Sequence, residues 1–453
     1  MLWYFPGGAS PEMGPTSILP SSQIMGIDDD PDAVSQVGNF VRAQINPAEG
    51  CAESGTHRIS PHLREHRLTS EPGQPAAFIV HTDIIHRGLP RTVPPVDAFP
   101  WRPLLKLQFF RTQEPVEREA PDVDWEAAGG GYGVGERLGD VWRTTWRWLH
   151  GRPDAPHEAE EDVRVDELVR RLRQAPRVGG EAERLAAAYA LGRAAQAGDA
   201  AASAALGAAL GDTAAESLRR AARGGLLAAG SAAWPIAAPL CRHDNGSVAR
   251  AAIEVVGECS TAAARAPCPG APTWEQVLRL LGEVAAQRQE QAGRALQCGS
   301  GSDWDVVAGC AKAAWLVAGA SRLAPDGARC RAALLPLLAL CLGSRGPDGD
   351  PEVEAPAHRV QTSARAARRN ASLALVSLAS CGGAGAAAER ELVALLQAAA
   401  GDDDRYVRSL GMEGLHRLSN AEAEAGMAGA RSKALGQLLR ARWCPLTDAT
   451  SPF

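Results

Sequence analysis

The hydrophobic and polar positions of this chain follow two different periods. Over residues 78–86 (FIVHTDIIH) and 101–111 (WRPLLKLQFFR) the apolar residues follow the two-residue period of a β-strand. From residue 165 onward alanine, leucine and arginine dominate, and apolar residues recur at helical spacing with hardly any extended β-branched run. The pattern predicts a strand-containing part followed by an all-helical part.

The two predicted strands carry a candidate pair of polar groups. Because side chains alternate along a strand, His86 shares an uncharged, inward face with Phe78, and the chain is expected to turn after it at Gly88. In the second strand the face that holds Leu105 is apolar, whereas Arg102 lies on the other face, towards a polar pocket. Neutral imidazole binds Fe(II), and a guanidinium holds a carboxylate with two hydrogen bonds, so this order suits non-haem iron chemistry.

Two separated stretches resemble the distal part of the phytanoyl-CoA dioxygenase family. They occur in the family's order and fall within residues 1–120. The matching residues are HRG at 86–88, Arg102, LKL at 105–107, FFRT at 109–112 and EP at 114–115, together with MGPT at 13–16 and LPSSQ at 19–23, where Ser21 replaces the usual glycine.

The resemblance implies a jelly-roll-like double-stranded β-helix that binds Fe(II) and 2-oxoglutarate. Such a site holds iron through a His-x-Asp pair and a distal histidine, and an arginine binds the 2-oxoglutarate carboxylate. The resemblance makes His86 the distal iron ligand and Arg102 the 2-oxoglutarate-binding residue. The family's His-x-Asp pair lies shortly before the strand that residues 2–5 resemble. We therefore expect this chain to lack both ligands and to be weak or inactive as an oxygenase by itself.

A second His-x-Asp triplet, His81 and Asp83, lies inside the first predicted strand. If these side chains pointed inward, His86, an odd number of residues further on, would point outward. A facial triad also takes its third ligand from a distant strand. We therefore interpret His81 and Asp83 as part of a solvated strand face.

Imperfect repetition in the helical part predicts stacked helical hairpins of the HEAT or armadillo type, with an alanine-rich helical bundle as the alternative. Similar segments at 184–195, 212–229, 243–258, 362–379 and 402–418 look like second helices of repeats, in which an early acid or amide caps the helix and an arginine bridges neighbouring repeats. Helices are predicted at 166–173, 181–196, 212–229, 247–259, 273–294, 306–323, 331–342, 362–379, 386–399, 405–418 and 428–443.

The predicted organisation has three parts. Residues 1–120 form a partial β-helix, residues 121–164 a linker rich in glycine, tryptophan and acidic residues with a short amphipathic helix, and residues 165–445 a HEAT-like solenoid. The arginines at 365, 368 and 369 are expected on a solvated helix face, with a partner-binding concave surface as the alternative.

The composition of the chain argues against some classes of binding partner. A net charge of -6 with 22% charged residues argues against a dedicated nucleic-acid binder, and no apolar run is long enough to span a membrane. The 10 cysteines contain no C-x-x-C pair, which indicates a reduced, intracellular, cytoplasmic protein, although a missing N-terminus would hide a targeting peptide.

Two functions follow: an oxygenase acting on a small-molecule or acyl substrate, or a scaffold that binds a protein partner on the concave face of the solenoid and carries a relic oxygenase segment.

Overall fold

The computed structural model describes residues 2–5, 14–18, 66–71, 74–79, 86–88, 105–107, 115–119, 123, 139–151, 164–174, 180–265, 270–295, 302–321, 326–344, 355–381 and 386–424. The chain divides into two compact units. The first comprises Met1–Phe110, Glu119–Leu149 and His157–Ala228, and the second Arg111–Arg118, His150–Pro156 and Ala229–Phe453. The expected boundaries at residues 120 and 164 stay a prediction.

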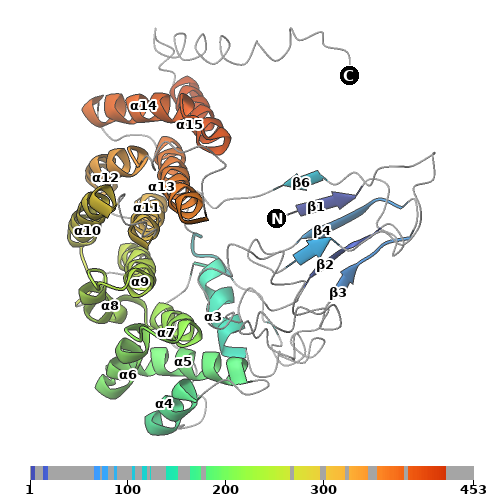
Figure 1. The fold of residues 1–453 in the computed structure, drawn as a ribbon, viewed down its shortest axis with the longest axis vertical. Helices are drawn as coiled ribbons and strands as arrows, with labels where there is room; N and C mark the ends of the chain where they lie inside the picture. The colour runs from blue at the N-terminus through green and yellow to red at the C-terminus, as the bar shows by residue number, and fades with distance from the viewer. Residues whose placement is uncertain are drawn as a thin grey trace. The chain divides into compact units, whose positions relative to one another are not determined.

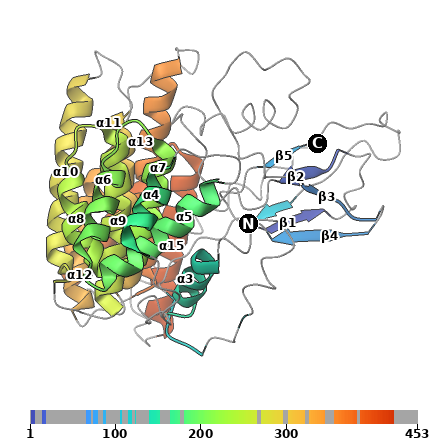
Figure 2. The same ribbon diagram turned by 90° about the horizontal axis from the view of Figure 1, so that it is seen from below.

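Six short strands in the described residues form two three-stranded antiparallel sheets. In the first sheet β1 (Leu2–Phe5) lies between β4 (Ala76–Ile79) and β6 (Leu105–Leu107). In the second, β2 (Thr16–Ile18) lies between β3 (His66–Leu68) and β5 (His86–Gly88), as Figure 2 shows.

The two sheets share a small apolar core. Trp3 and Phe5 of β1 and Leu68 of β3 are buried, and Ile18 and Phe78 pack against them. The rings of Phe5 and Phe78 meet edge to face, with centroids 5.8 Å apart. Because both sheets contribute to one cluster, their apolar faces pack against each other, as in a β-sandwich.

The predicted single strand over residues 78–86 is wrong. β4 ends at Ile79 and pairs with β1, whereas β5 begins at His86 and pairs with β2 in the other sheet. The chain therefore changes sheet between these strands, so Phe78 and His86 do not share a strand face. Gly88 belongs to β5 rather than to a turn, and Leu105, on the apolar face of the second predicted strand, is 54% exposed.

The described residues of the first unit include five α-helices: α3 (Gly139–Leu149), α4 (Val165–Arg173), α5 (Gly180–Gln196), α6 (Ala200–Leu210) and α7 (Glu216–Ala228). α4 packs on α5, α6 packs on α7, and α5 packs on α7. Glycine permits the last contact, because a Cβ at Gly225 would collide with the carbonyl of Ala188. α3 confirms the predicted short helix of the linker.

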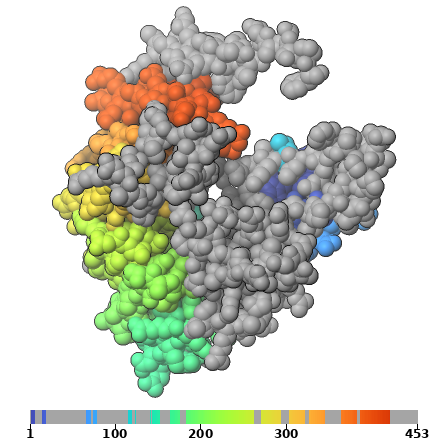
Figure 3. Space-filling view, in the orientation of Figure 1, coloured from blue at the N-terminus to red at the C-terminus, as the bar shows by residue number. Residues whose placement is uncertain are grey.

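The described part of the second unit contains a short 3-10 helix, η6 (Gly230–Ala233), and four pairs of α-helices. The pairs are α8 (Trp234–Leu240) with α9 (Gly246–Arg265), α10 (Trp274–Ala295) with α11 (Ser302–Ala320), α12 (Gly327–Leu342) with α13 (Ala355–Ala379), and α14 (Ala386–Ala400) with α15 (Arg405–Glu424). The second helices form a row in which α9, α11, α13 and α15 contact one another in turn, and α10, α12 and α14 form a parallel row (Figure 1). In the space-filling view the colours of this part of the chain follow one another from green through yellow to red (Figure 3).

The five segments predicted as second helices of repeats are α5, α7, α9, α13 and α15, and each is the second helix of its pair. Side-chain caps are present on two of these helices. Side-chain oxygens of Asn245 and Asp404 accept hydrogen bonds from backbone N–H groups in the first turns of α9 and α15. Asp212 accepts from the N–H groups of Ala214 and Ala215, which precede α7. The helical pairs and the caps of α9 and α15 are therefore confirmed, and the predicted helix at 428–443 lies outside the described residues.

Buried arginines join the helices at three places. Arg184, Arg288 and Arg368 each donate to a backbone carbonyl that follows an earlier helix and to a side chain near the start of a later one. The solvated face expected for the arginines at 365, 368 and 369 is wrong for Arg368, whose side chain is 5% exposed and contacts Asp402 and Asp403. The acceptors around each guanidinium offset the cost of burying its charge among apolar helices.

Candidate functional site

The residues expected to bind iron and 2-oxoglutarate are placed only in part. His86 is the first residue of β5 and pairs with Ile18 of β2. Arg102, His81 and Asp83 lie outside the described residues. Within the described ranges no group of three or more His, Cys, Asp or Glu side chains could hold a metal ion.

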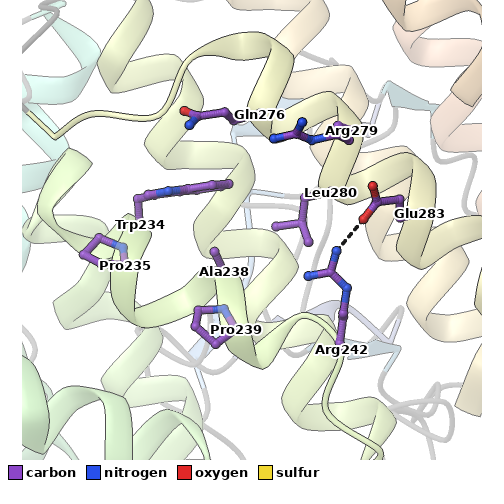
Figure 4. A pocket seen from close by; sticks show the side chains of 9 residues that line it. All are labelled: Trp234, Pro235, Ala238, Pro239, Arg242, Gln276, Arg279, Leu280 and Glu283. Carbon is purple, nitrogen blue, oxygen red and sulfur yellow. Dashed lines mark hydrogen bonds and ion pairs between the residues drawn. The ribbon is translucent and has the colours of Figure 1, made fainter.

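A groove of about 530 Å³ lies between α8 and α10 in the second unit. Its α8 side is formed by Trp234, Pro235, Ala238 and Pro239, followed by Arg242, and its α10 side by Gln276, Arg279, Leu280 and Glu283. In Figure 4 the side chains of Trp234, Ala238 and Leu280 lie between the prolines and the polar groups of α10.

The groove exists because α8 is short. Its seven residues include two prolines: Pro235 is tolerated in the first turn, and Pro239 lacks the N–H that would continue the helix. The helix ends at Leu240 and leaves exposed proline rings beside the longer α10. At the start of α10 a capping box fixes the opposite wall, because the Thr273 N–H donates to Gln276 and the Gln276 N–H donates to the Thr273 hydroxyl.

A buried arginine ties the two walls together. Arg288 of α10 donates to the carbonyl of His243, which lies in the loop after α8, and to the carboxylate of Asp303 at the start of α11, at 2.8 Å. The Arg288 side chain is 8% exposed and the Asp303 side chain 11%. This clasp holds the loop after α8 against α10, so the groove is preformed rather than a gap between loose helices.

The rim of the groove carries an excess positive charge. Arg242 and Glu283 form an ion pair across one end of it, and both are about half exposed. Arg279 is exposed and, among the residues that the structure describes, makes no ion pair or hydrogen bond. One guanidinium is thus left without an anionic partner at the edge of an apolar floor.

Comparison with known proteins gives no identity. No family model and no curated protein matches this chain. The groove and the strand pairing are the structural features that bear on function.

Four of the described cysteines have thiols of low reactivity. Cys241, Cys330 and Cys341 are buried, and burial raises the pKa of each thiol to about 12. Burial also raises the pKa of Cys310. The thiolate is the reactive form, so these groups behave as small apolar side chains.

Sequence reasoning missed the groove because it did not predict α8. The run WPIAAPL at 234–240 has two prolines and no polar face, so it carries no helical signal. A tryptophan followed by two prolines close to a helix end is the feature that could have indicated an exposed apolar surface.

Proposed function

We propose that the strand-containing part is the later portion of a phytanoyl-CoA-dioxygenase-like double-stranded β-helix and that the protein serves Fe(II)- and 2-oxoglutarate-dependent hydroxylation of an organic substrate, such as a small molecule or an acyl compound. The observation that supports this proposal most strongly is the order of strand pairing. It adds to the sequence resemblance of residues 1–120, which rests on residue identities and not on strand pairing.

An eight-stranded jelly roll distributes its strands over two facing sheets. If its first two strands are set aside, the third strand lies between the sixth and the eighth, and the fourth lies between the fifth and the seventh. β1 lies between β4 and β6, and β2 between β3 and β5, in the same order. The remaining two strands of such a fold would add to β5 and β6, which are edge strands of the described sheets.

His86 and Arg102 take their proposed roles from this order. His86 opens β5, and Arg102 precedes the first residue of β6, Leu105, by three positions. We propose that residues 1–120 hold only part of the iron site, His86 and Arg102, and that this chain by itself is a weak or inactive catalyst.

The first test maps the 5′ end of the transcript. The proposal expects an in-frame segment that encodes a strand with a His-x-Asp pair shortly before Leu2. The gene product that includes this segment is then assayed for succinate formation from 2-oxoglutarate. If translation begins at Met1 and no turnover is found, the oxygenase proposal is wrong.

Two variants of the active product test the assigned residues. His86→Ala abolishes turnover, whereas His81→Ala, the neighbouring histidine, keeps it. Arg102→Ala raises the KM for 2-oxoglutarate by about tenfold or more, because it removes a charge-assisted contact to a carboxylate, while Arg111→Ala does not. Thermal unfolding of all four variants is compared. Equal activity of His86→Ala and His81→Ala contradicts the assignment.

A second candidate is a non-enzymatic interaction scaffold built on a HEAT-like solenoid. It is favoured by the stacked helical pairs with capped second helices and by the preformed groove. This function predicts a stoichiometric complex: when the chain is purified at native abundance from its source cells, light scattering gives a mass above that of the chain alone. A lone chain in that measurement argues against the scaffold.

The proposed setting is a reducing cytoplasm. The six cysteines in the described residues are free thiols, which fits an intracellular protein. None of the helices in the described ranges is long and apolar enough to cross a membrane. Nucleic acid is not among the proposed partners, because the net charge is negative.

A further inference from the structure

We propose that the groove between α8 and α10 binds a short extended peptide of a partner protein, in which an acidic residue lies within a few positions of proline or leucine. The proposal deepens the scaffold function above and rests on it. It adds the binding surface and the chemistry of the partner.

The floor of the groove fits apolar side chains. Trp234 is half-buried and presents an indole ring, Pro235 and Pro239 expose rigid rings, and Leu280 is 6% exposed at the base. Ala238 gives the groove its depth, because its side chain ends at Cβ between the tryptophan and the leucine. An aromatic ring beside exposed proline rings accepts proline or aliphatic side chains, as aromatic-lined peptide grooves do.

The charge of the rim selects an acidic residue. The lining contains two arginines and one glutamate, and the glutamate is already paired with Arg242. Arg279 is left as a guanidinium on the edge of the apolar floor, one residue before Leu280. A carboxylate placed there forms a charge-assisted pair, whereas a lysine is repelled.

The form of the groove favours a chain segment over an enclosed small molecule. It is open to solvent, so a bound segment can enter and leave along it. Its walls are held by the Arg288 clasp and by the capping box of α10. Binding to a preformed surface requires little ordering of the protein, so a few side chains are sufficient for measurable affinity.

The test uses the full chain and a panel of synthetic fluorescein-labelled decapeptides. Each peptide has one glutamate placed one, two or three residues from a Leu-Pro pair in a Gly-Ser background. Matched peptides carry lysine in place of glutamate, or Gly-Ser in place of Leu-Pro. Fluorescence anisotropy measures binding, and we expect saturation for at least one glutamate peptide below about 1 mM.

Two variants and two controls locate the peptide. Arg279→Glu reverses the rim charge, and Ala238→Leu fills the floor; each is expected to weaken binding by about tenfold. Arg390→Glu, at an exposed arginine of α14, and Ala333→Leu, at an exposed alanine of α12, are expected to bind like the wild type. Circular dichroism confirms that each variant is folded.

The outcomes decide the proposal. The proposal is overturned if none of the glutamate peptides reaches saturation, or if the lysine peptides bind as tightly as the glutamate peptides. It is also overturned if Arg279→Glu and its control Arg390→Glu bind the peptide with equal affinity. If the chain instead self-associates in sedimentation and Ala238→Leu dissociates it, the occupant is a second copy and the peptide proposal is wrong. The scaffold function is judged separately by the native complex mass, so the two failures are distinguishable.

Discussion

Replacing Arg288 by methionine tests whether a buried arginine joins α10 to the loop after α8 and to α11. The guanidinium lies 2.8 Å from a carboxylate oxygen of Asp303, in a pair whose side chains are 8% and 11% exposed. Methionine keeps most of the apolar stem of arginine. It leaves the Asp303 carboxylate buried without a cation and the His243 carbonyl without this donor.

The expected loss is large because the remaining charge cannot return to water. Removing one partner of a buried ion pair costs about 3–5 kcal/mol. Arg242→Met is the matched control, since its pair with Glu283 is 48% and 53% exposed and contributes at most about 1 kcal/mol. With a urea dependence of about 2–3 kcal/mol/M, the unfolding midpoint falls by about 1–2 M for Arg288→Met and by less than about 0.5 M for Arg242→Met.

Urea unfolding followed by far-ultraviolet circular dichroism measures both shifts. The double variant Arg288→Met with Asp303→Leu is expected to recover more than half of the loss, because apolar replacement of both partners removes the uncompensated charge. Equal midpoint shifts in Arg288→Met and Arg242→Met would refute the reasoning, and so would a double variant that is no more stable than the single one.

Three further predictions concern packing, pH and thiol reactivity. Gly225→Ala lowers the stability of the first unit by about 1–3 kcal/mol through collision with the Ala188 carbonyl, whereas Gly282→Ala, with open space at Cβ, is neutral or stabilising by up to about 1 kcal/mol in thermal unfolding. Burial raises the pKa of Asp404, but the Arg369 side chain and backbone N–H donors outweigh burial and lower that pKa from 3.8 to about 2. The ionised carboxylate therefore stabilises the fold above pH 3.8, and this stabilisation is lost as the pH falls towards 2. In Asp404→Asn the midpoint of unfolding is expected to depend less on pH over that range than in the wild type. Iodoacetamide at neutral pH is expected to label Cys241, Cys330 and Cys341 only after urea is added, because their pKa values are about 12 in the folded protein. Labelling is measured by mass spectrometry of the peptides. Labelling of these cysteines in the native chain would contradict the prediction.

Helical periodicity was sufficient to predict most of the helices. Segments with an apolar stripe and a polar start, such as 212–229 and 402–418, correspond to α7 and α15. Their position as second helices of pairs followed from the recurrence of a capping residue and an arginine, which are local signals. The polar caps at Asn245 and Asp404 confirm that reasoning for α9 and α15.

Two helices escaped prediction because they lack a polar face. α6 reads AAASAALGAAL, in which almost every position is small or apolar and no stripe can be distinguished. α8 contains two prolines, and proline in a sequence predicts the end of a helix. The tertiary contacts that stabilise this short helix cannot be seen in the sequence. The groove depends on α8, so it could not be predicted either.

Contacts between residues far apart in the sequence also explain the expectations that were wrong. Arg368 is buried while Arg369, the next residue, is 40% exposed, and no local pattern distinguishes them. The informative signal was the triplet DDD at 402–404, one helical pair further along, which supplies the acceptors for both. In the strand-containing part, the alternation of apolar residues continues in the sequence from β4 to β5, although these strands belong to different sheets. His86 was therefore assigned to the strand of Phe78 instead of to β5.

The buried arginines have a second role in the helical core. The apolar side chains that α10 buries, such as Leu281 and Val284, attract without a fixed direction, so they oppose sliding of the helix less sharply than directed hydrogen bonds do. An arginine that must reach one particular carbonyl and one carboxylate opposes it, because a slip leaves the guanidinium unpaired in the core. We therefore expect the variant with Arg288→Met and Asp303→Leu to keep its helical content and to lose alignment of the groove walls, so its affinity for the glutamate peptide falls by more than about fivefold while its circular dichroism is unchanged. Wild-type peptide affinity in that variant would show that apolar packing alone fixes the position of α10.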